Sequence, residues 1–135
     1  MNGNIRWCRP DEGLVIYEIL QSQNVALAGQ VDWLRPLGPY WLLYCDPDPV
    51  ACLMVNPGTP VGRLEWLTIH KEATRKQTAK AVKGLCYAGG HVLREQGSQV
   101  AAWYLTDEQE SWKRIVEKHG GFPVEKGTLY MGRVG

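Results

Sequence analysis

The residues best suited to chemistry lie in an alternating run, 63–70, and in the basic segment that follows it. Glu65 and His70 are candidate bases that could take a proton from an amine. Arg75, Lys76 and Lys80 are cations that could pair with phosphate groups. A base near such cations would suit proton transfer beside a bound anionic ligand.

Two regular elements must position these residues. The run 63–70 has a period of two and is rich in β-branched and aromatic residues, which predicts a strand. One predicted face holds Leu64, Trp66 and Thr68, and the other holds Glu65, Leu67 and Ile69. A helix follows, with Thr74 as its N-cap and Gly97 as its C′ residue. Its predicted apolar face contains Ala79, Val82, Leu85, Cys86, Gly89, Val92 and Leu93.

Each candidate also has an ordinary structural interpretation. Glu65 would be a solvent-facing glutamate beside Arg63, and His70 a surface histidine at a loop entrance. The cations would be the solvated first turn of a helix, although cations are disfavoured at a helix N-terminus unless an anion lies there. Tyr104 and Tyr130 are candidate acids, but most buried tyrosines are structural. Cys86 lies on the apolar helix face and is predicted to be a core residue.

Composition limits the class of protein. The 135 residues suit one domain with one core, and 44% hydrophobic residues indicate an ordinary globular chain. The net charge of +1 provides no electrostatic case for binding nucleic acid or a membrane. No apolar run has the length of a membrane span, and no signal peptide is evident. Six Trp against one Phe indicate core packing or, alternatively, an exposed aromatic patch that meets a partner.

The four cysteines form no Cys-x-x-Cys pair, so we expect reduced thiols in a cytoplasmic protein and no metal site.

Other runs along the chain complete the predicted order of elements. A short strand spans 4–9, a helix begins at 10–12 and ends near Gln23, and a second helix is possible within 24–38. The apolar runs 40–45 and 50–55 flank the turn 46–49 and predict an antiparallel hairpin. After Gly97 come a buried strand at 99–105, a helix at 107–119 and a possible hairpin within 122–134.

This order, β-α-(α)-β-β-β-α-β-α-β-β, resembles the GNAT family of acyl-CoA-dependent N-acetyltransferases. The run from Ile69 to Ala81 lies along the family's strand–loop–helix pattern without a gap, and the segment 112–122 resembles its closing helix and Gly-Phe. The resemblance implies a single α/β domain over 1–135, acetyl-CoA as cofactor and an unidentified amine as acceptor. It implies that Glu65, His70 or Tyr104 is catalytic. It also implies that the cofactor is bound by Ile69, Thr74, Arg75, Lys76, Gln77, Thr78, Ala79 and Lys80.

Four positions depart from the family pattern. Gln77 stands where the first loop glycine is expected, and it would crowd the approach of backbone N–H groups to a pyrophosphate. Thr74 replaces an arginine or glutamine. In the later helix, Val116 or Glu117 takes the place of a tyrosine that often protonates the leaving thiolate, and Gln109 or Glu110 that of an asparagine.

In its size and in these departures, the chain resembles small acetyltransferase-like proteins of tailed bacteriophages, including an internal virion protein. That resemblance implies an alternative function: a protein that has lost catalysis and works as a virion or partner-binding component. It would lie in the host cytoplasm or the virion, alone, as a homo-oligomer or with a virion protein partner.

The expected site is a cleft where the fourth and fifth strands run parallel and separate at their carboxyl ends. Its lips would be Ile69-His70 and Leu105-Thr106, and its floor would be the loop 71–78. Pairing of the two strands along their whole length would exclude a cleft. A cleft blocked by the side chain of Gln77 or Trp103 would favour the non-catalytic alternative.

Overall fold

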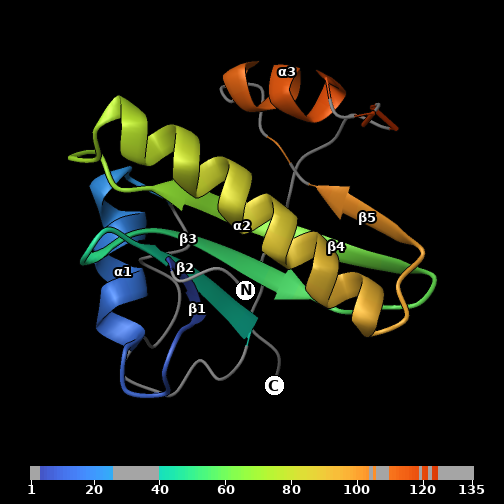
Figure 1. Ribbon diagram of the computed structural model, residues 1–135, viewed down its shortest axis with the longest axis horizontal. Helices are drawn as coiled ribbons and strands as arrows, with labels where there is room; N and C mark the ends of the chain where they lie inside the picture. Colours follow the sequence, from blue (N-terminus) through green and yellow to red (C-terminus); the bar gives the residue numbers. More distant parts are fainter. Residues whose placement is uncertain are drawn as a thin grey trace. The chain divides into compact units, whose positions relative to one another are not determined.

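The computed structural model describes residues 4–25, 40–103, 105, 110–118, 120–121 and 123–124, in two compact units, 1–104 and 105–135 (Figure 1). The first unit contains β1 (Ile5–Trp7), α1 (Gly13–Ser22), β2 (Trp41–Cys45), β3 (Pro49–Asn56), β4 (Val61–Ile69), α2 (Arg75–Glu95) and β5 (Val100–Trp103). The second contains α3 (Glu110–Lys118). The predicted elements within 24–38 and 122–134 lie mostly outside the described residues, and the single-domain prediction stays a prediction.

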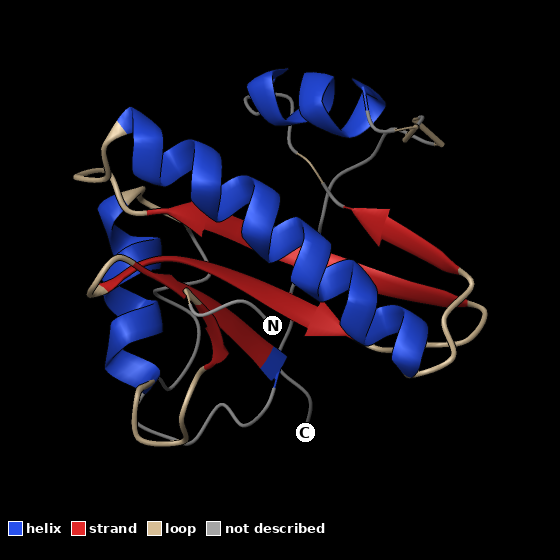
Figure 2. Ribbon diagram, viewed as in Figure 1, coloured by secondary structure: helices blue, strands red, loops and turns tan. Residues whose placement is uncertain are grey.

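The strands of the first unit form one mixed sheet in the order β1-β2-β3-β4-β5 (Figure 2). The first four strands are antiparallel neighbours, and β4 and β5 are parallel. These pairings confirm the predicted hairpin and the predicted parallel crossover through α2. The chain therefore has the predicted mixed α/β architecture.

The two long helices cover opposite faces of this sheet. On one face, α1 packs Ile16, Ile19 and Leu20 against a cluster from β2 and β3 that includes Leu43 and Cys52. Leu42 and Leu53 alternate with those strand residues and are fully buried on the other face, which α2 covers. The α2 residue Gly89 lies so close to the side chains of Leu53 and Leu64 that an added Cβ would meet them at 3.0 and 2.8 Å.

A β-bulge in β4 corrects the predicted alternation. Met54 pairs with Glu65 and Cys52 with Thr68, so β4 has one more residue than β3 between these pairs. Trp66 has φ +59°, a left-handed conformation that is uncommon for a bulky residue. Trp66 packs on the α1 face, whereas Leu64 faces α2, so the prediction that they share a face was wrong.

The bulge also sets which residues share a face with Glu65. Glu65 pairs with Met54, which packs on the α1 side, so Glu65 shares that face with Trp66 rather than opposing it. Beyond the bulge, Thr68 shares the face of its partner Cys52. Leu67 and Ile69 then turn to the α2 side by alternation.

The ends of α2 form as predicted, but its buried face differs in part. Thr74 is the N-cap, and Gly97 has φ +93° at the C′ position. The N–H groups of Gly97 and Ser98 donate to the carbonyls of Arg94 and Leu93, which is a Schellman motif. Ala79 is exposed, contrary to prediction, and Cys86 and Val92 are half-buried. The fully buried residues are Ala81, Val82, Leu85, Ala88, Gly89 and Leu93.

The second unit contributes one described helix. The predicted helix 107–119 is observed as α3, and Gly120 follows it with φ +94°. Among its apolar residues, Trp112 and Val116 are half-buried and Ile115 is exposed. No helix in the described ranges is long and apolar enough to cross a membrane.

Candidate functional site

The side chain of Gln77 closes the first turn of α2. Its Oε1 accepts a hydrogen bond from the backbone N–H of Thr74 at 2.9 Å. The backbone N–H of Gln77 donates to Thr74 Oγ1 at 3.1 Å, and the two bonds together form a capping box. Its Nε2 donates to the carbonyl of Asp46, in the β2–β3 turn, at 3.2 Å. This turn joins β2 and β3, which lie on one side of β4 in the sheet, whereas β5 lies on the other side. Gln77 therefore points away from the gap between β4 and β5.

The predicted cofactor-binding residues of this turn fall into two groups. The first group is used internally: besides Thr74 and Gln77, Thr78 donates both its N–H and its hydroxyl to the Thr74 carbonyl at 2.9 Å. The second group is the cations Arg75, Lys76 and Lys80, which are exposed and have no ion pair within the described chain. The first turn of α2 contains no acidic residue. Cations without a neutralising partner at a helix N-terminus are unfavourable unless an anion binds there.

The β4–β5 pairing covers only the start of β4. Val61 to Leu64 pair with Val100 to Trp103, and the rest of β4 has no strand neighbour on that side in the described chain. All of β5 is thus paired with the start of β4, and residues 104 and 106–109, which would continue it beside the rest of β4, lie outside the described residues, so the predicted separation of the two strands stays a prediction. Trp103 is half-buried at the last paired position. Of the predicted second lip, Thr106 lies outside the described residues.

Glu65 lies directly after the last β4–β5 pair, and one of its carboxylate oxygens is anchored. Asn56 Nδ2 donates to Glu65 Oε1 at 2.7 Å, and Arg63 Nε lies 3.3 Å from the same oxygen. The side chain is only 15% exposed, so the interpretation of Glu65 as a solvent-facing residue was wrong. Oε2 has no partner within the described chain and is not sealed in the interior. Glu65 thus has one oxygen held by the protein and one available for a ligand.

His70 is fixed by its own loop. The Glu72 N–H donates to Nδ1 at 3.1 Å, so in the neutral ring the proton is on Nε2. Nε2 lies 3.9 Å from Glu18 Oε1 on α1. The backbone of His70 also bonds to Val50 and Ala73. With Nδ1 occupied and Nε2 protonated, the ring has no free nitrogen to act as a base, which favours the structural interpretation of His70.

Of the remaining predicted residues, Ile69 lies at the end of β4. Ile69 is buried, and its carbonyl accepts a hydrogen bond from Gln23 Nε2 at 2.8 Å, which ties the end of β4 to α1. Tyr104, Tyr130 and Gln109 lie outside the described residues. Glu110, Val116 and Glu117 are on α3, in the second unit.

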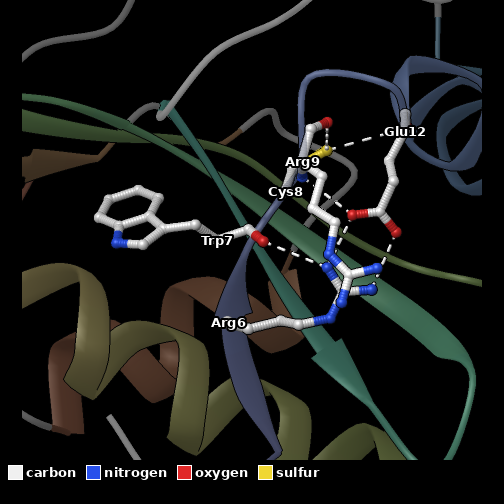
Figure 3. Close-up of polar contacts among 5 residues, drawn as sticks. All are labelled: Arg6, Trp7, Cys8, Arg9 and Glu12. Atoms are coloured by element: carbon white, nitrogen blue, oxygen red, sulfur yellow. Dashed lines mark hydrogen bonds and ion pairs between the residues drawn. The ribbon is translucent and has the colours of Figure 1, made fainter.

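A second Arg–Glu pair lies at the start of the chain (Figure 3). Arg6 donates to both oxygens of Glu12 at 2.7 and 2.8 Å, and the Arg9 N–H donates to Glu12 Oε1 at 2.9 Å. The hydrogen bonds from Arg6 lower the pKa of Glu12 to about 2. Arg6 also donates to the Trp7 carbonyl. These contacts join β1 to the start of α1, and they use the whole carboxylate.

The cysteines show no sign of chemistry. All four are free thiols. Burial raises the pKa of Cys8 to about 11 and that of Cys86 to about 12, and it also raises the pKa of Cys45 and Cys52. A neutral thiol is a poor nucleophile, in agreement with the prediction that Cys86 is a core residue. The described residues contain no cluster that could hold a metal ion.

An open groove lies at the C-terminal end of α2, at the opposite end of the helix from the basic first turn. It measures about 460 Å³ and lies between Gly90 and Arg94 of α2 and the chain from Ser98 to Ala101. Because it adjoins the amino end of β5, it is not the cleft predicted at the carboxyl ends of the strands.

Solved structures match the fold over nearly the whole chain. A transcriptional regulator from Bacillus halodurans C-125 aligns with a TM-score of 0.67 and 14% identity, covering 96% of this chain and 98% of its own. An aminoglycoside N-acetyltransferase in complex with CoA aligns at 0.65 and 14%, covering 96% and 94%. A ribosomal-protein-alanine N-acetyltransferase from Brucella melitensis biovar Abortus 2308 aligns at 0.65 and 14%, covering 96% and 98%. No family model and no curated protein matches the sequence.

These likenesses show that the chain has the GNAT acetyltransferase fold, which confirms the predicted fold. Within that fold, sequence reasoning missed two residues that contact Glu65 directly. Arg63 was considered only as a surface neighbour of Glu65, and no site role was predicted for Asn56. Asn56 pairs with Arg63 across the β3–β4 hairpin, and this register brings its amide to Glu65.

Proposed function

We propose that this protein is an N-acetyltransferase that transfers the acetyl group of acetyl-CoA to a primary amine. The observation that carries the proposal is the orientation of Gln77. The residue that departs most from the family pattern turns its side chain to the β2–β3 turn and leaves the basic start of α2 open. Arg75, Lys76 and Lys80 then remain available to hold the phosphates of the cofactor, together with N–H groups of the first turn.

The cofactor, when bound, supplies an acetyl group activated as a thioester. In this proposal Glu65 accepts the amine proton through Oε2, and the anchoring of Oε1 by Asn56 and Arg63 supports that role. A base fixed through one oxygen loses little freedom when the amine arrives, which favours reaction. The amine acceptor is a proposal at the level of chemical class: two of the matched structures are named for an aminoglycoside and for the alanine of a ribosomal protein.

The proposal is tested first by binding and then by turnover. Calorimetry should detect acetyl-CoA binding, and Arg75→Glu should weaken it at least about tenfold by placing a negative charge at the phosphate site. Arg9→Glu is the matched control, because Arg9 is an exposed arginine near the start of α1. CoA release should then be assayed with an aminoglycoside and with a peptide that begins with alanine. Absence of binding at millimolar acetyl-CoA would contradict the proposal.

The non-catalytic alternative has less support from the described residues. It was motivated by Gln77, by the missing tyrosine of the later helix and by the surplus of tryptophans. Gln77 does not enter the gap beside β4, and none of the described tryptophans is exposed: Trp7, Trp41, Trp66, Trp103 and Trp112 are buried or half-buried. A stable complex with a partner protein, in a chain that fails to bind acetyl-CoA, would favour that alternative.

A further inference from the structure

A row of basic side chains follows the outward face of α2. We call it the α2 stripe: Lys76, Lys80, Lys83, Tyr87 and Arg94. At 100° per residue these positions lie within a narrow arc opposite the buried face. All five are exposed, and Tyr87 exposes 82% of its surface. At 1.5 Å per residue the α2 stripe is about 27 Å long.

The charges of the α2 stripe are not balanced within the described chain. The solvated face of an ordinary helix usually mixes signs, because opposite charges four residues apart stabilise it and like charges destabilise it. Here Lys76, Lys80 and Lys83 succeed one another at spacings of four and three. The one acidic residue of α2, Glu95, pairs with His91 at 3.1 Å. The α2 stripe therefore carries a repulsion that an anionic ligand would relieve.

A glycine on the same side of the helix is a second, independent observation. Gly89 and Gly90 are adjacent, but only Gly89 is explained by packing, since its Cβ would meet Leu53 and Leu64. A Cβ on Gly90 would meet nothing within 4 Å. Glycine destabilises a helix interior relative to alanine, and its usual benefit is the close approach of another molecule to the backbone. Gly90 lies between Tyr87 and Arg94 in the sequence, and because it has no side chain it leaves the helix backbone uncovered at that point.

We propose that the α2 stripe binds single-stranded nucleic acid, with the four cations on the phosphates and Tyr87 stacked on a base. Lysines with one exposed aromatic ring suit this ligand, because phosphate contacts supply affinity and base–aromatic stacking needs unpaired bases. A protein partner is less well matched, since lysine is depleted in protein interfaces. The net charge of +1 does not oppose the proposal, because the fold gathers positive charge on one face.

The test measures anisotropy of a labelled oligothymidylate of about 12 nucleotides over a range of salt concentrations. Four phosphate contacts predict a slope of about −3 in log K against log salt. Lys83→Glu with Arg94→Glu should weaken binding at least about tenfold and roughly halve the slope, whereas Arg9→Glu should change neither. Tyr87→Ala should weaken binding roughly fivefold or more and leave the slope unchanged.

The α2 stripe shares Lys76 and Lys80 with the proposed cofactor site, so the two proposals are separated by acetyl-CoA binding of a variant that changes neither lysine. Lys83 and Arg94 are outside the residues proposed to hold the cofactor, so the double variant should bind acetyl-CoA as the parent does. No oligonucleotide binding at low salt would overturn the inference, whatever the chain does with acetyl-CoA. So would equal losses in the double variant and in Arg9→Glu. Binding of polyglutamate as tight as that of the oligonucleotide, with no effect of Tyr87→Ala, would identify an acidic protein as the partner instead.

Discussion

Two glutamates of this chain are equally exposed, at 15% of the side chain, and each faces an arginine. Glu12 gives both oxygens to Arg6 and accepts a third bond from a backbone N–H. Glu65 gives one oxygen to Asn56 and Arg63, and its Oε2 has no partner within the described chain. The two sites therefore differ in how much of the carboxylate the fold uses, although burial and partner type are alike.

This difference separates a structural carboxylate from one available for chemistry. Both oxygens of Glu12 are needed to hold β1 against the start of α1, so the site has no capacity for a ligand (Figure 3). Glu65 is held firmly enough to keep its position and still has one oxygen that can accept a proton. A sequence comparison of the two Arg–Glu pairs would not distinguish them, because the distinction is geometric: Arg6 binds both oxygens of Glu12, whereas Arg63 reaches only Oε1 of Glu65.

The largest expected effect is loss of catalysis in Glu65→Gln. The amide keeps the shape of the side chain but cannot act as a base, so acetyl transfer to the best amine acceptor should fall at least about 100-fold. CoA release with a thiol reagent measures the rate, and Glu12→Gln is the matched control, expected to retain activity at a temperature where it is folded. An active Glu65→Gln protein would show that the available oxygen is not the base.

The next largest effect concerns stability, in Glu12→Gln. Loss of the ion pair should lower the free energy of unfolding by about 1 kcal/mol, a value reduced by the partial exposure of Arg6. Because the folded state lowers the pKa of Glu12 to about 2, this stabilisation is present above the ordinary pKa near 4.5 and is lost as the pH falls through 2. Denaturant titrations of the parent and variant should therefore converge between pH 5 and pH 2. A constant difference across that range would contradict the assignment.

A smaller effect is expected when the anchor of Glu65 is removed in Asn56→Ala. The 2.7 Å hydrogen bond fixes Oε1, and without it the carboxylate can rotate away from the amine. The turnover number should fall about tenfold while the KM for acetyl-CoA stays unchanged. A fall in stability with no change in turnover would show that Asn56 supports the β3–β4 hairpin and does not position the base.

The smallest effect is expected in Arg63→Ala. Arg63 is 64% exposed and approaches Glu65 at 3.3 Å, so solvent screens the pair. We expect a change in turnover of about twofold, and smaller still at high salt. If Arg63→Ala lowers the turnover number as much as Asn56→Ala does, the charge of Arg63 contributes to catalysis.

The elements of this fold were predictable because their periods are clear. The strand 61–69 and the helix 75–95 follow from an alternation of two and from a helical apolar face. The role of Gln77 could also have been predicted, since Thr74-x-x-Gln77 is a capping-box signature, but it was compared only with a loop glycine. The bulge at Trp66 had no such signal, because the residue with positive φ is a tryptophan and not a glycine.

The partners of Glu65 could not be derived from periodicity. They depend on the register of the β3–β4 hairpin, in which Asn56 pairs with Arg63, and on side-chain contacts between strands. The cofactor-binding turn was predicted in place, but its division into capping residues and unpaired cations required the hydrogen bonds of Thr74, Gln77 and Thr78.

The bulge in β4 also sets the faces of all the strand residues that follow it. Glu65 and Trp66 point to the same side, so Leu67 and Ile69 face α2, and Thr68 shares the α1 face with its partner Cys52. Alternation without the bulge would instead turn Thr68 toward α2 and Ile69 toward α1. Deleting Trp66 would remove the extra residue and leave Thr68 and Ile69 on their present faces, whereas one residue inserted after Leu67 would exchange them. We therefore expect the sheet to tolerate the deletion of Trp66 better than this insertion.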